Sequence, residues 1–217
     1  NNNLKIGMEA PDFDAVSTMG DISLSSYKGK WIVFFSHPND FSPICTTEII
    51  GLAKADTYFK KINTELIGIS VDSLNSHLAW LYDIYLKTGL IVNFPIIADQ
   101  NGVIARKYGM ISNDVSSTET VRNIFIIDDK GIIRSIFVYP MNIGRYIPEI
   151  LRTVTALQYS DQNNCMTPAN WSPGNPMIVP PPKTFNALRE RNESINKNRN
   201  GMCWYLSFKN PETKKLE

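Results

Sequence analysis

The residues best suited to chemistry in this chain lie around Cys45, in residues 36–48 (SHPNDFSPICTTE). Ser42 followed by Pro43 is typical of a helix start, with serine as the N-cap and proline as the first helical residue. Cys45 then becomes the third helical residue, next to the unpaired N–H groups and the positive end of the helix dipole. A thiolate is stabilised in such a position, so Cys45 is a candidate nucleophile; the alternative is an inert thiol buried as a small apolar side chain.

Four short apolar runs predict the strands that must position this segment. They are Trp31–Ser36, 65–71, Arg122–Ile127 and 132–139. The last two flank an Asp-Asp-Lys-Gly turn and should pair as a hairpin. Because the Cys45 segment follows the first strand and leads into a helix, we expect it at the carboxyl edge of the sheet. Arg122 opens a neighbouring strand, and its guanidinium could hold a thiolate and orient an oxygen substrate together.

Amphipathic patterns predict helices over 46–62, 74–86 and 145–159, and with the strands they indicate an α/β sheet covered by helices. Residues 1–160 form the predicted catalytic domain. Residues 161–217 form a C-terminal arm that holds seven of the thirteen prolines. We expect this arm to lack a core of its own and to lie along the main domain or another subunit. Its aromatic side chains favour docking over disorder. They are Trp171, Trp204, Tyr205 and Phe208.

Composition excludes several classes of protein. The chain has 22 basic and 21 acidic residues in 217, which argues against a dedicated nucleic-acid binder. The longest apolar runs are too short to span a bilayer. Three cysteines are an odd number at wide spacing, so we expect a cytoplasmic protein and no disulfide scaffold. The spacings of cysteine and histidine fit no zinc motif, and C-x-x-C is missing. We therefore expect neither a metal nor a cofactor, and no thioredoxin-like disulfide exchange.

The pattern Pro38-x-x-x-Ser42-x-x-Cys45 resembles the active-site pattern of the peroxiredoxin (AhpC/TSA-like) family. The flanking His37 and the run from Cys45 to Glu48 resemble its peroxiredoxin-6, archaeal-type branch. Further matches extend through most of the chain. They are residues 142–145, 167–171 and 179–182. The resemblance implies a thioredoxin-like fold with a long C-terminal dimerisation arm, and thiol-dependent reduction of hydrogen peroxide and organic hydroperoxides in antioxidant defence and redox homeostasis.

Carried over to this chain, the resemblance implies that Cys45 is the peroxidatic cysteine and forms a sulfenic acid. Arg122 would favour the thiolate and stabilise the charge that develops on the transferred oxygen. Pro38 would shield the sulfur from water. The Ser42 hydroxyl would bind the peroxide, a role that competes with its predicted use as an N-cap.

Three further residues are candidates for supporting roles. The resemblance implies that Glu48 and Arg145 support the catalytic arginine, although each could instead be a solvated helix residue. His37 is either a neighbour of the active site or a loop residue. His77, inside a predicted amphipathic helix, is interpreted as structural.

The sulfenic acid needs a second thiol for its reduction. Cys203 resembles the resolving cysteines of archaeal-type members, acting from a neighbouring subunit, although those members carry another cysteine where this chain has Ser207. The alternative is a one-cysteine cycle with an external reductant, either a thioredoxin-like protein or a low-molecular-weight thiol. Cys165 has no recognised counterpart and is interpreted as a free thiol in a loop.

Assembly follows from the resemblance as well. It implies a homodimer completed by the arm and suggests further assembly into a homodecamer. A non-enzymatic chaperone or scaffold that uses the aromatic arm is the remaining alternative to a peroxidase.

Overall fold

The computed structural model describes residues 4–112, 114–198 and 200–210. The chain divides into two compact units, one up to Ile147 and one from Pro148 onward. The predicted domain boundary between residues 160 and 161 stays a prediction.

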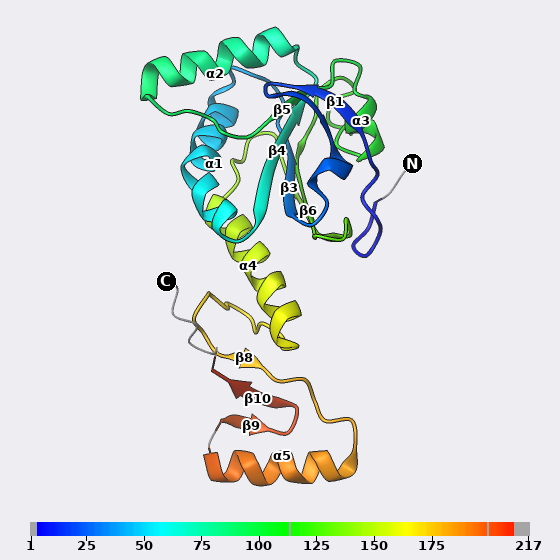
Figure 1. Ribbon diagram of the computed structural model, residues 1–217, viewed down its shortest axis with the longest axis vertical. Coiled ribbons are helices and arrows are strands. Elements are labelled where there is room, and N and C mark those ends of the chain that lie inside the picture. The colour runs from blue at the N-terminus through cyan, green and yellow to red at the C-terminus, as the bar shows by residue number, and fades with distance from the viewer. Residues whose placement is uncertain (1–3, 113, 199, 211–217) are drawn as a thin grey trace. The chain divides into compact units, whose positions relative to one another are not determined.

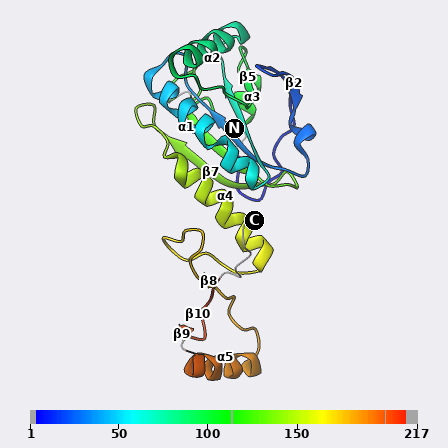
Figure 2. The same cartoon turned by 60° about the vertical axis from the view of Figure 1, so that its left-hand side comes forward.

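The strands of the first unit are β1 (Asp14–Ser17), β2 (Gly20–Ser23), β3 (Trp31–Ser36), β4 (Thr64–Ser70), β5 (Ile96–Ala98), β6 (Arg122–Ile127) and β7 (Ile133–Tyr139). Among the described residues they form one mixed sheet in the order β2-β1-β5-β4-β3-β6-β7 (Figure 1). β3, β4 and β5 run parallel, whereas β6 is antiparallel to β3. Figure 2 shows the β1–β2 hairpin at one edge of the sheet, away from β7. The carboxyl end of β3 therefore lies beside the first residue of β6.

The predicted strands agree with this sheet. β3 and β6 have the predicted bounds, and β6 pairs with β7 as an antiparallel hairpin with Ile124 opposite Phe137. Gly131 ends the intervening turn with φ +84°, a conformation that glycine adopts without strain. β5 was not predicted, because three residues give too short an apolar pattern.

The helical elements of the first unit are η1 (Leu24–Tyr27), α1 (Pro43–Lys61), α2 (Leu74–Thr88) and α3 (Val103–Lys107). α1 begins at the predicted proline and buries Ile49, Leu52 and Phe59. α2 starts after the N-cap Ser73, whose side chain accepts a hydrogen bond from the backbone N–H of Ser76. These caps and apolar stripes fix where both helices begin and which face they bury.

An aromatic cluster forms the centre of the core in this unit. The Phe34 ring of β3 lies 4.8 Å from the ring of Tyr108 and 5.3 Å from that of Phe13, between centroids. Phe125 of β6 packs edge-to-face on Tyr108 at 5.3 Å. The Tyr108 hydroxyl donates a 2.7 Å hydrogen bond to the carbonyl of Pro11, so its polar atom is satisfied. The core holds β3 and β6 rigidly together, and these two strands carry the site residues.

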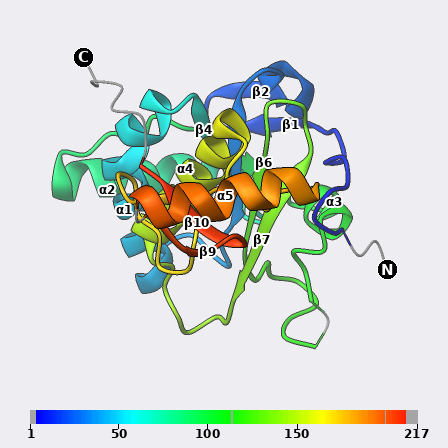
Figure 3. The ribbon, with the colours of Figure 1, turned by 90° about the horizontal axis from the view of Figure 1, so that it is seen from below.

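The second unit contains α4 (Ile147–Asn163), β8 (Met177–Ile178), α5 (Phe185–Asn198), β9 (Gly201–Cys203) and β10 (Leu206–Lys209). The three strands form a small sheet in the order β8-β10-β9, and α5 lies alongside β9 (Figure 3). Trp171 and Met177 are buried, and the Trp171 ring lies 5.7 Å from that of Tyr159. The region after residue 160 thus packs against α4, a helix that the sequence analysis placed in the main domain.

α4 begins at Ile147, two residues after the predicted start, because Arg145 is buried outside the helix. None of the helices in the described ranges is long and apolar enough to cross a bilayer.

Candidate active site

Cys45 is the third residue of α1, as the Ser42-Pro43 pair predicts. The thiol is completely buried. The Ser42 hydroxyl oxygen accepts a 3.3 Å hydrogen bond from the backbone N–H of Cys45, which confirms the predicted N-cap. The sulfur therefore lies in the first turn of a long helix, where the dipole favours a negative charge.

Arg122, the first residue of β6, reaches Cys45 from the neighbouring strand. Its Nη1 lies 3.4 Å from the Cys45 Sγ and 2.7 Å from Oε2 of Glu48. Its Nε and Nη2 both donate to the carbonyl of Met141, at 3.1 and 3.0 Å. The guanidinium is buried, and all three of its nitrogens make hydrogen bonds, to Met141 and to Glu48. Its orientation is therefore fixed, with Nη1 facing the sulfur.

Glu48 lies one turn after Cys45 on α1 and bridges two arginines. Besides Arg122, it accepts from Nη2 of Arg145 at 2.6 Å, and from Nε and the backbone N–H of that residue at 2.9 Å each. Nη1 of Arg145 donates to the carbonyls of Ser36 and Asn123 at 2.9 and 3.3 Å. All three charged side chains are buried, so Glu48 and Arg145 are not solvated helix residues.

Pro38 and His37 lie in the loop between β3 and α1, and both are buried. His37 Nε2 lies 2.9 Å from Oδ1 of Asp40. Burial lowers the pKa of His37 below its ordinary value, and the hydrogen bond to Asp40 offsets only part of this effect. His37 is therefore a neutral imidazole at neutral pH.

Asp40 and His77 belong to the same hydrogen-bonded cluster as His37. Neither the contact of Asp40 with His37 nor its contact with His77 was predicted from the sequence. His77 Nδ1 lies 2.8 Å from Oδ2 of Asp40, and its Nε2 lies 3.1 Å from the carbonyl oxygen of Ile97. The backbone N–H of Asp40 donates to Asp72 at 3.1 Å. One signal was available, because His77 falls on the apolar face of a predicted helix, where an unpaired imidazole would be costly.

His37, Asp40 and His77 are also the described residues whose geometry could hold a metal ion, since one donor atom of each lies within 4.8 Å of the others. The donor atoms are already engaged with one another at 2.8–2.9 Å. A metal would have to displace the protons in the hydrogen bonds from His37 and His77 to Asp40, and it would have to find further ligands among buried groups. Hydrogen bonding accounts for this cluster more directly than metal binding does.

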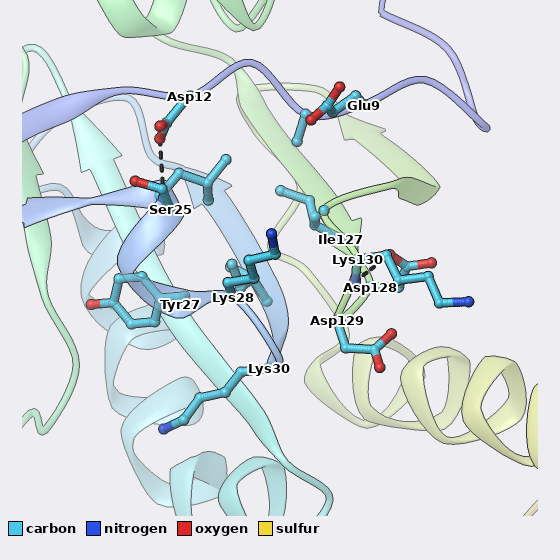
Figure 4. A pocket seen from close by; sticks show the side chains of 14 residues that line it. Glu9, Asp12, Ser25, Tyr27, Lys28, Lys30, Ile127, Asp128, Asp129 and Lys130 are labelled. Carbon is cyan, nitrogen blue, oxygen red and sulfur yellow. Dashed lines mark hydrogen bonds between the residues drawn. The ribbon is translucent and has the colours of Figure 1, made fainter.

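A separate cavity of about 190 Å³ lies at the other end of β3 (Figure 4). Lys28, Lys30 and Asp129 contribute charged side chains to its walls, and Asp12 accepts a 3.0 Å hydrogen bond from the backbone N–H of Ser25. β3 separates it from the Cys45 loop by about 16 Å at the rise of a strand. This cavity is therefore not part of the Cys45 site.

The other two cysteines lie in the second unit. Cys203 ends β9 and is half-buried, and Cys165 is buried just after α4. Both thiols are free. Ser207 is buried and accepts a 2.8 Å hydrogen bond from Nη1 of Arg191.

A cysteine at a helix start, faced by a buried arginine and set on a mixed sheet covered by helices, defines a thiol enzyme of thioredoxin-like fold. Residues 6–136 match the model of the AhpC/TSA family, and residues 156–194 match that of the C-terminal domain of 1-Cys peroxiredoxin. The chain belongs to the peroxiredoxin family, and it is a thiol-dependent peroxidase. This confirms the resemblance inferred from the Pro-Ser-Cys pattern.

Relatives resemble the chain over nearly its whole length. Peroxiredoxin 2 of Caldanaerobacter subterraneus subsp. tengcongensis is 52% identical over 207 residues, which cover 94% of this chain and 92% of the relative. The peroxiredoxin of Methanosarcina mazei is 44% identical, with coverage of 94% and 96%.

Solved structures agree with this similarity. A yeast mitochondrial 1-Cys peroxiredoxin has a TM-score of 0.83 at 39% identity, covering 96% of this chain and 100% of the other. A cysteine-to-serine mutant of the peroxiredoxin 6 of Arenicola marina has a TM-score of 0.84 at 31% identity, with coverage of 97% and 100%.

Proposed function

We propose that Cys45 is the peroxidatic residue and reduces hydrogen peroxide and organic hydroperoxides. Its thiolate attacks the terminal oxygen, an S–O bond forms as the O–O bond breaks, and hydroxide or alkoxide leaves and takes up a proton. The cysteine is left as a sulfenic acid. The observation that carries this proposal is the 3.4 Å distance between the Cys45 Sγ and Nη1 of Arg122 at the start of α1.

Arg122 would act by holding positive charge where negative charge moves. During the attack, charge passes from the sulfur to the leaving oxygen, and a fixed N–H donor stabilises it along that path. Glu48 and Arg145 would keep the guanidinium from rotating away, because Glu48 binds both arginines. A donor of this kind is worth on the order of 10²–10³ in rate.

Ser42 can serve as N-cap and bind substrate at the same time. The bond from the backbone N–H of Cys45 uses a lone pair of the hydroxyl oxygen, so the hydroxyl proton is left for a peroxide oxygen. Serine lacks the methyl group that would stiffen this side chain. The buried Pro38 has no N–H and would exclude water from the sulfur.

Peroxide consumption by the Cys45→Ser variant tests the central proposal. With dithiothreitol as reductant, this variant should have no turnover and an unchanged circular dichroism spectrum. Cys165→Ala, at the other buried cysteine, is the matched control and should keep wild-type turnover. Turnover retained by Cys45→Ser would refute the role of Cys45.

The first candidate for the recycling thiol is Cys203. Its thiolate would attack the sulfenic sulfur of a neighbouring subunit, water would leave, and a disulfide with Cys45 would remain for an external dithiol to reduce. In support, Cys203 is a free and only half-buried thiol.

An external thiol is the second candidate, because the C-terminal match is to 1-Cys peroxiredoxin. The yeast mitochondrial relative is described as resolved by the glutathione and thioredoxin systems. Either reductant would then attack the sulfenic acid of Cys45 directly, and Cys203 would be dispensable.

A non-reducing gel of peroxide-treated protein distinguishes the two candidates. Resolution by Cys203 predicts a covalent dimer band that Cys203→Ser removes and Cys165→Ala retains. A one-cysteine cycle predicts no such band and the same turnover in all three proteins when a glutathione or thioredoxin system is supplied.

We also propose that the second unit mediates homodimer formation. In support, it exposes Phe185, Met202 and Tyr205, at 74%, 81% and 58% of their surface. Large apolar side chains of this kind are typical of interfaces. Assembly into a decamer, a chaperone role and a cytoplasmic location stay predictions.

A further inference from the structure

Asp40 lies between two histidines that are themselves completely buried. Its Oδ1 is 2.9 Å from Nε2 of His37, and its Oδ2 is 2.8 Å from Nδ1 of His77. Burial by itself would raise the pKa of Asp40, but the hydrogen bonds from His37 and His77 outweigh burial and hold it well below its ordinary value. Asp40 is therefore a carboxylate at neutral pH, and its oxygens can only accept hydrogen bonds.

Both ring nitrogens of His77 face groups that can only accept. Nδ1 faces the Asp40 carboxylate, and Nε2 lies 3.1 Å from the carbonyl oxygen of Ile97 in β5. An imidazole that donates from both nitrogens carries two protons, so these partners assign His77 as an imidazolium. Its positive charge balances the negative charge of Asp40 inside the protein.

His37 is in the opposite situation. Its Nε2 faces Asp40, whereas Nδ1 has no hydrogen-bond partner within the described part of the chain. A single proton on Nε2 leaves a lone pair on Nδ1, in a side chain without solvent exposure. Buried acceptors without a partner are uncommon in folded proteins and are found at functional sites. The Asp40 carboxylate favours the tautomer with the proton on Nε2, because that proton can be donated to it.

The loop that carries these groups needs outside support. Phe41, next to Asp40, has φ +56°, a left-handed conformation that strains a bulky residue. Such conformations persist where the surroundings over-determine them. Here the fixed contacts of Asp40 are its two histidines and a backbone hydrogen bond to Asp72 at 3.1 Å. Ser42, the N-cap of the helix that bears Cys45, follows directly after Phe41.

We propose that His77 is a positioning residue of the peroxidase site. As an imidazolium it orients Asp40, and Asp40 fixes His37 as the Nε2–H tautomer and holds the strained turn before Ser42 in place. This inference rests on the proposed role of Cys45. The charged and titratable groups of this cluster are Asp40 and His37 from the loop, His77 itself, and Asp72, which precedes the N-cap of α2 and faces Asp40 and His37. Asp72 also accepts a hydrogen bond from the Ser70 hydroxyl, so it keeps this partner when His77 is substituted.

Nitrogen NMR of the histidine rings tests the protonation states without any turnover. The chain has only two histidines, so protein with labelled histidine gives two ring spectra. In Cys45→Ser at pH 7, one ring should show two protonated nitrogens, and the other should show a protonated Nε2 and a bare Nδ1. The spectrum of His77→Asn assigns the remaining ring to His37. Two neutral rings, or stoichiometric zinc found by metal analysis, would overturn the proposal.

Variants of His77 test its effect on the reaction. His77→Leu removes both donors, and we expect the rate constant for sulfenic acid formation to fall about 10- to 100-fold. His77→Asn keeps a donor close to the position of Nδ1 and should recover most of that loss. Lys87→Ala, on the exposed side of the same helix, is the matched control and should keep the wild-type rate.

A purely structural role for His77 predicts a different result. It would lower the melting temperature of His77→Leu but leave the His37 ring signals and the rate unchanged, and that outcome refutes the proposal. If His77→Leu does not fold, the rate and the His37 spectrum are measured on His77→Asn instead. An unchanged rate together with a changed His37 tautomer in that variant also refutes the proposal. Failure of the Cys45 proposal is separate, because it appears as turnover in Cys45→Ser.

Discussion

Two buried carboxylates near the active site each bridge two basic side chains, but the net charges of the two clusters differ. Glu48 lies between Arg122 and Arg145, and Asp40 lies between His37 and His77. Two guanidiniums and one carboxylate carry a net charge of +1, because arginine is always protonated. One imidazolium, one neutral imidazole and one carboxylate carry no net charge. The first cluster can stabilise an anion, whereas the second can only hold groups in position.

The location of each cluster agrees with this difference. The Glu48 cluster directs an N–H of Arg122 at the Cys45 sulfur. Within the described ranges, the hydrogen bonds of the Asp40 cluster do not reach the sulfur; they connect the loop before α1 with His77 of α2, with Asp72 and with β5. We therefore expect substitutions in the first cluster to change the charge and hydrogen bonding at the sulfur directly, and substitutions in the second to act on the rate only through the position of the loop before α1.

The largest effect is expected for Arg122→Ala. Removing the N–H that faces the sulfur should slow sulfenic acid formation on the order of 10²–10³-fold, as for the loss of one oxyanion donor. Stopped-flow fluorescence with hydrogen peroxide measures this step. Arg122→Lys keeps the charge but loses the fork that binds Met141 and Glu48, so it should recover only part of the rate. A wild-type rate in Arg122→Ala would remove this residue from the site.

A smaller effect on rate is expected for Glu48→Gln. The amide keeps the shape of the side chain but leaves two buried guanidiniums without a counter-charge, which should lower the free energy of unfolding by about 3–5 kcal/mol. The Arg122 guanidinium should also become less well fixed, and we expect a rate loss of about 10-fold. Urea denaturation and stopped-flow kinetics measure the two effects. Unchanged stability would contradict the structural role of the bridge.

A smaller effect on stability than for Glu48→Gln, with a distinct pH dependence, is expected for Asp40→Asn. Because the folded-state pKa of Asp40 is lowered, its stabilising contribution is complete above the unfolded-state pKa of about 3.9. It is lost progressively as the pH falls below that value. The difference in free energy of unfolding between wild type and variant should be about 3 kcal/mol at pH 7. It should shrink by about 1 kcal/mol between pH 5 and pH 3.

The control for this prediction is a measurement over the same pH range for Asp83→Asn, at an exposed ion pair on α2. Its free energy of unfolding should follow the wild type closely, because exposed pairs contribute little. A difference for Asp40→Asn that stays constant from pH 7 to pH 3 would mean that Asp40 is not an ionised partner of the two histidines.

The parts of the site that could be predicted are those with local signals. The Ser42-Pro43 pair located the start of α1 and so the environment of Cys45. The apolar run that begins at Arg122 located the neighbouring strand. Both signals act over a few residues, where capping and strand periodicity are decided.

The parts that could not be predicted depend on contacts between residues far apart in sequence. Asp40 and His77 are separated by 37 positions, and no pattern in either segment indicates their pairing. Arg145 was placed at the start of a helix, but its side chain and backbone N–H are bound to Glu48, and the helix begins at Ile147 instead. Tertiary hydrogen bonds to a buried carboxylate overrode the local helical pattern here.

The short segment between β7 and α4 has a mechanical consequence. It contributes the Met141 carbonyl that holds the Arg122 fork, and Arg145, which is bound to Glu48. The second unit begins at Pro148, three residues after Arg145. A displacement of the chain between Met141 and Pro148 would therefore act on the hydrogen bonds that orient Arg122 and Glu48. The connection between the two units and the orientation of the groups around the Cys45 sulfur therefore depend on the same few hydrogen bonds.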